Sequence, residues 1–529
     1  MAWHTTAIFY ELYLRAFADG NNDGHGDFIG LREKLDYLKW LGVDCIWLLP
    51  VYPSPLRDDG YDIASFYGIH ENFGLLEDFK MTVEAIHAKG MRIVADLVVN
   101  HTSDQHPWFK EARRSKDSPW RDYYVWNDTD EPYSDARIIF LDTETSNWTY
   151  DEPTDSYFWH RFYSTQPDLN YENPKVQAEM LNVMKFWLDL GIDGFRVDAV
   201  PYLFEEEGTI CENLPATHAY LAKMRKFVDD NYPDTVLLGE ANQWPEDVVE
   251  YFGTEENPEF HLNFHFPVMP RLYMALAQGD RSSIIDIMRR TPTPPAGAQW
   301  ATFLRNHDEL TLEMVTEEER QFMWETYSPD IKQRMNLGIR RRLAPLMNND
   351  RAKIELMHSM LFTLPGTPVL YYGDEIGMGD NIALFDRNGV RTPMQWNTDK
   401  NAGFSGADTL YAPVISDEIF GYERVNVEAA ENDESSLLYT VRQMITTRKT
   451  HPALATADIE WLDELPKHAL CFWRREGEAE YLILNNLSEV ELSIELDEGL
   501  VFTDILTGEN AISDSVTLGR YGYRWLLVE

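Results

Sequence analysis

The sequence predicts an α/β protein built on a (β/α)8 TIM barrel, with an inserted lid domain after the third strand and a C-terminal antiparallel β-sandwich. Short β-rich runs alternate with amphipathic segments, which is the pattern of βα units around a parallel sheet. Eight such runs precede a change of pattern near residue 455. A chain of 529 residues can hold this barrel and one or two smaller domains, because single cores rarely exceed about 300 residues.

The eight predicted strands are rich in β-branched and aromatic residues. They span residues 7–14, 43–50, 91–96, 192–198, 235–240, 260–264, 301–305 and 368–372. The predicted helices have apolar residues at three- and four-residue spacing, as in 31–41, 76–89, 176–190 and 218–231. Eight units of this kind predict a closed barrel.

Three domains follow from this pattern. Residues 1–100 and 172–455 form the catalytic barrel, with a mostly helical excursion at about 309–350. Residues 101–171 are rich in Trp, Tyr and Pro/Asp turns without a long periodic helix, so we expect an irregular inserted domain over the top of the barrel. Residues 456–529 alternate in short strands, which predicts the C-terminal β-sandwich domain.

Charge and composition exclude several classes of partner. The chain has 46 basic and 89 acidic residues, a net charge of −43, and a field of that sign repels nucleic acid and anionic membranes but not a neutral sugar. Solubility and adaptation to a salty medium both account for the charge. The first residues lack an export signal, no run is long enough to span a membrane, and the three cysteines favour reduced thiols. We expect a cytoplasmic protein, and a homo-oligomer is compatible with the sequence.

Polar side chains end four of the predicted strands, where barrel enzymes carry their chemistry. Each of these residues alone could be a cap or an ion pair, but their conjunction favours an active site. They are Asp96, Asn100 and His101 after the third strand, Arg196 and Asp198 on the fourth, Glu240 after the fifth, and Asn306, His307 and Asp308 after the seventh.

Arg196 and Asp198 alternate along one strand, so both side chains face the same side while Val197 faces the other. The guanidinium is expected to keep the neighbouring carboxylate ionised, as a nucleophile requires. A proton donor instead needs a raised pKa from apolar or carboxylate surroundings. Two carboxylates tuned in opposite directions are the requirement for retaining glycoside hydrolysis.

These residues resemble the four main conserved regions of the α-amylase superfamily of glycoside hydrolases, and the resemblance runs from residue 5 to about 455. The sequence 166–170, Gln-Pro-Asp-Leu-Asn, resembles an additional region near the inserted domain. The sequences 42–47 and 366–375 resemble the second and eighth strands of the family. The resemblance independently implies the barrel, and it implies a retaining enzyme acting on α-glucosides.

By this resemblance Asp198 is the nucleophile, Glu240 the acid/base, and Asp308 the carboxylate that holds hydroxyls of the distorted reacting sugar. Tyr61 is expected to stack on the glucose, and the aspartate beside it, Asp62, to pair with Arg391 and close the non-reducing end. The substrate-binding set that the resemblance implies is Tyr61, Asp62, His101, Phe162, Arg196, His307 and Arg391.

Two structural metal sites are expected. The loop with Asp19, Asn21, Asp23 and Asp27 spaces oxygen ligands with glycines as a calcium loop does, although a solvated turn has the same composition. Family likeness implies a second site, whose ligands are the side chains of Asn100, Asp168 and Glu205 and the backbone oxygens of Tyr202 and Leu203. Calcium is the expected ion, with magnesium an alternative at the first loop. No organic cofactor is expected.

The reaction depends on finer motifs. Residues 335–350, 371–381, 387–396 and 401–405 resemble the branch of the family that interconverts maltose and trehalose. The resemblance implies that freed glucose turns within a closed site and is joined again, with some hydrolysis to glucose. The alternatives are an exo-acting α-glucosidase that hydrolyses small α-glucosides and a transglucosylase to another small acceptor. An inactive binding relative is disfavoured, because all three carboxylates are present.

Overall fold

The computed structural model describes residues 2–497 and 499–529. Eight parallel strands close into a barrel in chain order, and the last strand pairs with the first. The predicted barrel is therefore confirmed, and each predicted strand overlaps one observed strand. The strands are β1 Phe9–Leu12, β2 Cys45–Leu48, β3 Arg92–Val98, β7 Gly194–Asp198, β8 Val236–Gly239, β9 Leu262–Phe264, β10 Gln299–Phe303 and β13 Thr367–Tyr371.

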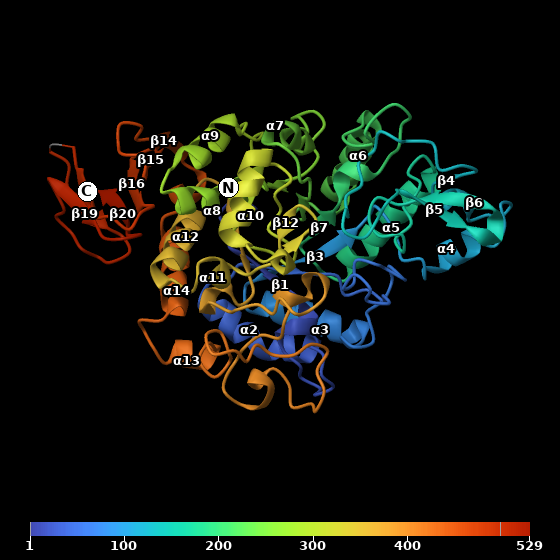
Figure 1. The fold of residues 1–529 in the computed structure, drawn as a ribbon, viewed down its shortest axis with the longest axis horizontal. Coiled ribbons are helices and arrows are strands. Elements are labelled where there is room, and N and C mark those ends of the chain that lie inside the picture. Colours follow the sequence, from blue (N-terminus) through green and yellow to red (C-terminus); the bar gives the residue numbers. More distant parts are fainter. Residues whose placement is uncertain (1, 498) are drawn as a thin grey trace.

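Helices surround the barrel, and most of them bury one apolar face against the strands. Figure 1 shows them outside the strands. Helix α2 begins after Asp27, whose side chain accepts a hydrogen bond from the Gly30 N–H, and ends at Gly42 with a φ of 105°, a left-handed conformation that suits glycine. The longer helices of the barrel are α2 Phe28–Leu41, α3 Leu76–Ala88, α5 Pro174–Asp189, α6 Pro215–Asn231, α8 Val268–Gln278, α9 Ser282–Arg290, α12 Arg351–Thr363 and α14 Leu437–Thr450.

The inserted segment between β3 and α5 is rich in packed aromatic side chains, some of which join the main core. It holds the short helix α4 (Pro107–Ala112) and a three-stranded antiparallel sheet in the order β4 (Trp126–Asn127), β6 (Ser156–Trp159), β5 (Trp148–Asp151). The rings of Phe109 and Trp126 stack with centroids 5.6 Å apart. Large rigid side chains thus stabilise a domain that contains little regular structure.

The excursion after β10 combines a helix with a narrow hairpin. Helix α10 (Glu317–Tyr327) begins in a capping box between Thr316 and Glu319. The hairpin of β11 (Arg334–Met335) and β12 (Gly338–Ile339) follows, and α11 (Leu343–Leu346) leads back to the barrel. Ile339 exchanges two backbone hydrogen bonds with Leu310, which fixes the hairpin beside the end of β10.

The C-terminal segment forms two antiparallel sheets around a separate apolar core. One sheet has the order β14 (Asp458–Trp461), β15 (Ala469–Glu476), β16 (Ala479–Asn486), β20 (Tyr523–Val528), β18 (Phe502–Asp504), and the other pairs β17 (Leu492–Glu495) with β19 (Ser515–Leu518). This confirms the predicted fold. Arg281 joins the barrel to it by donating to the carbonyls of Leu462 and Ala469.

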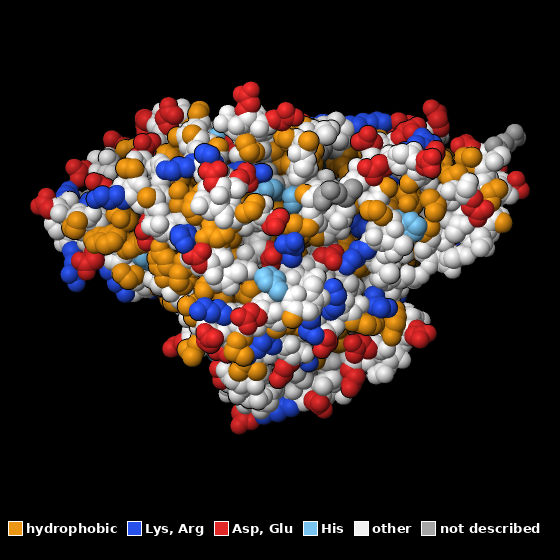
Figure 2. Space-filling view, turned by 180° about the vertical axis from the view of Figure 1, so that it is seen from behind, with side chains coloured by type: hydrophobic (Ala, Val, Ile, Leu, Met, Phe, Trp, Pro, Cys, Tyr) orange, Lys and Arg blue, Asp and Glu red, His pale blue; other side chains and the backbone are white. Residues whose placement is uncertain are grey.

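The C-terminal sheets and the inserted domain lie at opposite ends of the long axis (Figure 1). Acidic side chains are spread over the face in Figure 2, with basic side chains among them. Among the described residues, the helices include none that is both long and apolar enough to cross a membrane.

Candidate active site

The predicted carboxylates meet around one buried guanidinium at the carboxyl ends of β3, β7 and β8. Strands β3 and β7 pair in register, so Asp96 lies opposite Arg196. The Nη1 atom of Arg196 lies 2.6 Å from both Asp96 Oδ1 and Asp198 Oδ1, and its Nη2 atom lies 2.6 Å from Glu240 Oε1. Residues that are far apart in the sequence lie close together here, because three neighbouring parallel strands end at the same rim of the barrel.

The charge balance of this cluster differs from the sequence prediction. Burial raises the pKa of the Asp198 carboxyl, Arg196 lowers it, and the charges of Glu240 and Asp96 raise it again, so that the pKa lies above its usual range. We expected Arg196 to keep Asp198 ionised, and that expectation overlooked that the arginine is shared. One guanidinium cannot neutralise three carboxylates in a site shielded from water.

Asp308 has the opposite environment. Its carboxylate lies 3.0 Å from Arg387, 3.0 Å from Arg391 and 3.2 Å from the Nε2 atom of His307. Burial acts to raise the pKa of Asp308, but His307 and the two arginines lower it below its usual range. This environment favours the ionised form of Asp308, whose oxygens can accept hydrogen bonds.

The two predicted histidines are both buried at the site. Burial lowers the pKa of His101 to about 3, and burial also lowers the pKa of His307 well below its usual range. The ring of His307 stacks on Tyr61 at a centroid distance of 5.3 Å, and Phe162 lies 5.2 Å from His101. The buried Nε2 atom of His101 has no hydrogen-bond partner among the described residues, so it is free to bind a sugar hydroxyl.

Glu11 is a site residue that the sequence reasoning missed. Its Oε1 atom lies 2.6 Å from His307 Nδ1 and accepts from the His307 backbone N–H at 3.1 Å. Glu11 thereby holds the ring of His307 toward Asp308. The available signal was a charged residue within the apolar run that forms β1.

The predicted pairing of Asp62 with Arg391 is wrong. Arg391 binds Asp59 at 2.8 Å and Asp308 at 3.0 Å. Asp62 instead accepts from Ser54 Oγ and from the backbone N–H groups of residues 57 and 58. Because these N–H groups lie in a turn without secondary structure, the Asp62 carboxylate is needed to satisfy them. Asp62 thus shapes the loop that presents Asp58, Asp59 and Tyr61.

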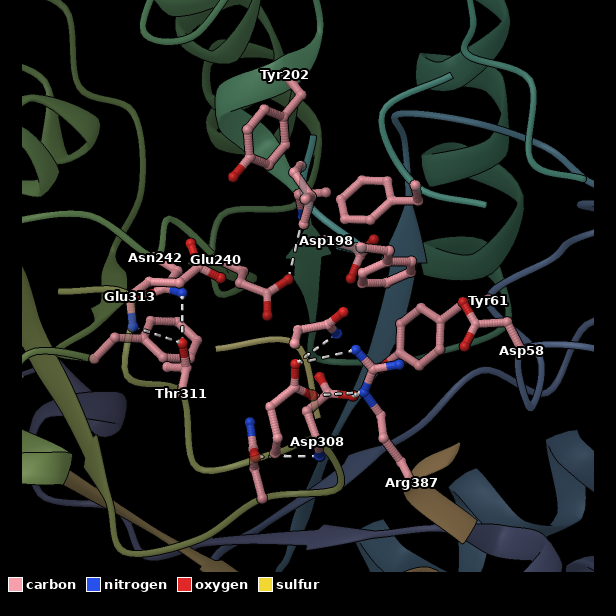
Figure 3. A pocket seen from close by; sticks show the side chains of 18 of the residues that line it. Asp58, Tyr61, Asp198, Tyr202, Glu240, Asn242, Asp308, Thr311, Glu313 and Arg387 are labelled. Atoms are coloured by element: carbon pink, nitrogen blue, oxygen red, sulfur yellow. Dashed lines mark hydrogen bonds and ion pairs between the residues drawn. The ribbon is translucent and has the colours of Figure 1, made fainter. Parts of the chain in front are cut away.

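The cavity has two chemically distinct sides (Figure 3). Tyr61 and Asp58 lie on one side of Asp198, and Asn242, Thr311 and Glu313 gather on the other. The inserted domain contributes three apolar side chains to the lining, those of Ile139, Phe140 and Phe162. Sequence reasoning missed this second side, because its residues lie in loops, where no periodic pattern marks them.

Contacts between three loops form a roof over the cavity. Asn336, in the turn of the β11–β12 hairpin, donates its backbone N–H to Asp142 at 2.7 Å, and the Asp142 N–H returns to Asn336 Oδ1 at 3.4 Å. Tyr163 of the inserted domain donates to Asp386 at 2.7 Å. Arg387 lies 4.9 Å from the centre of the Phe140 ring. Three segments from the inserted domain, the excursion and the loop after β13 therefore meet over one cavity.

The residues predicted to bind metals differ in how their oxygens are used. In the first loop, Asp19 accepts from the N–H groups of Asn22 and Gly24, and Asp27 accepts from those of Gly20, Asn21 and Gly30. Asn21 and Asp23 are exposed at the tip of this loop, where Asn21 donates to Asp23.

In the second set, Asn100 Oδ1, Asp168 Oδ2 and Glu205 Oε1 are buried without hydrogen-bond partners among the described residues. Burial raises the pKa of Glu205, and the nearby charge of Asp168 raises it further. Among the described residues, no group of three or more His, Cys, Asp and Glu side chains is arranged to hold a metal ion. A cation at the second set would therefore also need the amide oxygen of Asn100 and backbone oxygens such as those of Tyr202 and Leu203.

Comparison with known proteins agrees with this geometry. Residues 11–330 and 339–457 match the model of the alpha amylase catalytic domain. A protein from Pimelobacter sp. named trehalose synthase is 53% identical over 99% of this chain and 95% of its own length. An oligo-1,6-glucosidase from Parageobacillus thermoglucosidasius is 32% identical over 94% of this chain and 93% of its own length.

A solved structure shares the whole architecture. The crystal structure of the trehalulose synthase MutB from Pseudomonas mesoacidophila MX-45 superimposes with a TM-score of 0.83 at 27% identity, and the match covers all of both chains. The similarity therefore includes the inserted and C-terminal domains as well as the barrel.

Proposed function

We propose that this chain, which belongs to the α-amylase family, isomerises maltose to trehalose within one closed site, with some hydrolysis to glucose. The observation that carries the proposal is the polar second side of the cavity beyond Asp198, roofed by the inserted domain. A hydrolase needs only to admit water there. An isomerase must hold a free glucose long enough for it to turn.

The first half of the reaction transfers glucose to the enzyme. Asp198 attacks the anomeric carbon of the non-reducing glucose while Glu240 gives its proton to the glycosidic oxygen, so a glucosyl ester forms as the C–O bond breaks. Asp308, His101 and His307 bind the hydroxyls of the reacting sugar. The backbone N–H of Ala199 donates to Glu240 Oε2 at 3.3 Å and orients that carboxyl.

The second half returns glucose to a sugar acceptor. The freed glucose turns until its anomeric hydroxyl faces the ester carbon, and Glu240 removes the proton as the new bond forms and the ester breaks. Two inversions retain the α configuration. We infer that Asn242, Thr311 and Glu313 hold the turning glucose, because their polar atoms line the cavity opposite Tyr61.

Hydrolysis is the second candidate function. The triad is also sufficient for an α-glucosidase, and a relative at 32% identity is named oligo-1,6-glucosidase. Incubation with maltose and separation of the sugars distinguishes the two. The proposal predicts trehalose as the main product with less glucose, whereas glucose as nearly the sole product would overturn it.

We also propose that a structural cation, calcium by its oxygen ligands, binds at Asn100, Asp168 and Glu205 with the backbone oxygens of Tyr202 and Leu203. Three buried acceptor oxygens without donors support this site. At the Asp19–Asp27 loop, calcium or magnesium would have to use exposed Asn21 and Asp23, because N–H groups engage the buried carboxylates. Metal analysis and melting with a chelator test both sites, and an unchanged melting temperature together with no bound metal would overturn them.

For the cellular setting, we propose a cytoplasmic enzyme without an organic cofactor, acting on maltose and trehalose. Cys45, Cys211 and Cys471 are buried as free thiols, which supports a reducing compartment. Homo-oligomers are compatible with this proposal. Size measurement by light scattering and localisation of the tagged protein in its host test these two points.

A further inference from the structure

We propose that Glu212 is a positioning residue that sets the ratio of isomerisation to hydrolysis, although it lies outside the substrate cavity. This inference rests on the proposed function. Glu212 belongs to the long connection between β7 and α6, and its side chain is only 4% exposed. Nothing in the proposed chemistry uses it.

Glu212 joins three donors that come from separate parts of the chain. Its Oε1 atom lies 2.9 Å from Arg137 and 2.9 Å from Arg161, both in the inserted domain. Its Oε2 atom accepts from Gln243 Nε2 at 3.1 Å, in the loop after β8. One carboxylate thus connects the inserted domain to the rim of the barrel.

Two of these connections lead to the acceptor side of the cavity, which is the second side formed by Asn242, Thr311 and Glu313. Arg137 lies 2.5 Å from Glu313 and donates to the Tyr202 hydroxyl at 3.1 Å. Gln243 follows Asn242 directly, and Asn242 donates to Thr311 Oγ1 at 3.2 Å. Glu212 thus contacts Glu313, Asn242 and Thr311 of the acceptor side indirectly, and it reaches Tyr202, which also lines the cavity.

Local backbone structure holds Glu212 in place. Its neighbours Cys211 and Asn213 have φ values of 54° and 56°, a left-handed conformation that is unfavourable for residues other than glycine. Arg161 donates to the Cys211 carbonyl at 3.1 Å, and the Tyr251 hydroxyl bonds to the Asn213 side chain. A buried carboxylate between two guanidiniums is costly to remove, because the arginines then lose their counter-charge.

The reacting-sugar side is organised separately. Among the described residues, the hydrogen bonds of Glu212 reach none of Asp198, Glu240 and Asp308, which are held by Arg196, Arg387 and Arg391. Loss of Glu212 should therefore loosen Glu313 and Asn242 while it leaves glucosyl transfer to Asp198 intact. Water then competes better with the freed glucose.

The test compares Glu212→Gln and Glu212→Ala with the wild type. Glutamine keeps one acceptor oxygen and removes the charge, so it is the conservative variant. Asp151→Asn is the matched control, because Asp151 is a buried carboxylate of the inserted domain that pairs with Arg113 at 2.7 Å outside the cavity. Two activities are measured: products from maltose, and hydrolysis of p-nitrophenyl α-glucoside, whose leaving group does not need to be retained.

We expect the trehalose-to-glucose ratio to fall about fivefold in Glu212→Gln and more than about tenfold in Glu212→Ala. Hydrolysis of the aryl glucoside should stay within about twofold of the wild type in Glu212→Gln. The control should keep both activities. An unchanged product ratio in Glu212→Gln would overturn the inference, as would an equal loss of both activities, which would show a purely structural role. A wild type that makes no trehalose would instead overturn the proposed function.

Discussion

The Nε atom of Arg387 lies 3.0 Å from Asp308 Oδ1, and the same guanidinium lies against the ring of Phe140 in the inserted domain. Arg387 also pairs with Glu309 at 2.7 Å. It therefore links the carboxylate that binds the reacting sugar to the roof of the site. A disturbance of the roof can reach the chemistry through this one side chain.

Replacing Arg387 should damage catalysis more than stability. In Arg387→Ala, Asp308 loses one of its two guanidiniums and the roof loses its contact with Phe140. We expect kcat/KM for maltose to fall about 100-fold. Arg340→Ala serves as a control, because Arg340 donates to carbonyls of the same loop without reaching Asp308. Steady-state kinetics measure both variants, and a loss below about threefold in Arg387→Ala would show that the contact is dispensable.

The contact between Asp142 and Asn336 should keep the freed glucose inside the site. Asn336→Ala removes the side-chain oxygen that accepts a hydrogen bond from the Asp142 N–H, so the roof should open more often. With maltose and labelled free glucose, we expect label to enter the trehalose made by this variant. Trehalose from the variant that stays as free of label as wild-type trehalose would argue against a role in closure.

Activity should fall at acidic pH because the carboxyl cluster takes up protons. The pKa of Asp198 is raised by burial and by Asp96 and Glu240, so its protonation removes the nucleophile at a pH above the usual range of an aspartate. The acidic limb of kcat/KM should therefore lie above about pH 4. In Asp96→Asn one charge that raises the pKa is lost, and the limb should move to lower pH. A shift to higher pH would contradict this assignment.

The surface charge predicts a response to salt. A net charge of −43 repels itself in the folded chain, and ions screen that repulsion. If the acidic surface is an adaptation to salt, the melting temperature should rise as sodium chloride is raised from about 0.05 M to 1 M. A melting temperature that does not change would assign the charge to solubility alone.

The sequence predicted the barrel because its signals are local. Each strand is a short apolar run, and Asp198 and Glu240 lie at the ends of such runs. Parallel strands bring these ends together whatever the connecting loops do. The resemblance of the motifs then supplied the roles of the two carboxylates.

Contacts between residues far apart in the sequence could not be predicted from local patterns. Glu11 contacts His307, which lies 296 positions later in the sequence. Arg391 pairs with Asp59 rather than Asp62, and the conformation of a single turn decides between them. The raised pKa of Asp198 depends on how many carboxylates share Arg196, which only the assembled rim decides. Glu212 lies in an irregular loop, where no periodicity marks a buried charge.

Isotope tracing tests the central claim most directly. The wild-type enzyme is incubated with unlabelled maltose and an excess of uniformly labelled glucose, and the trehalose is analysed by mass spectrometry. Intramolecular isomerisation in a closed site predicts that trehalose forms as the main product and carries no label. Glucose as nearly the sole product, or trehalose labelled in proportion to the free glucose, would contradict it.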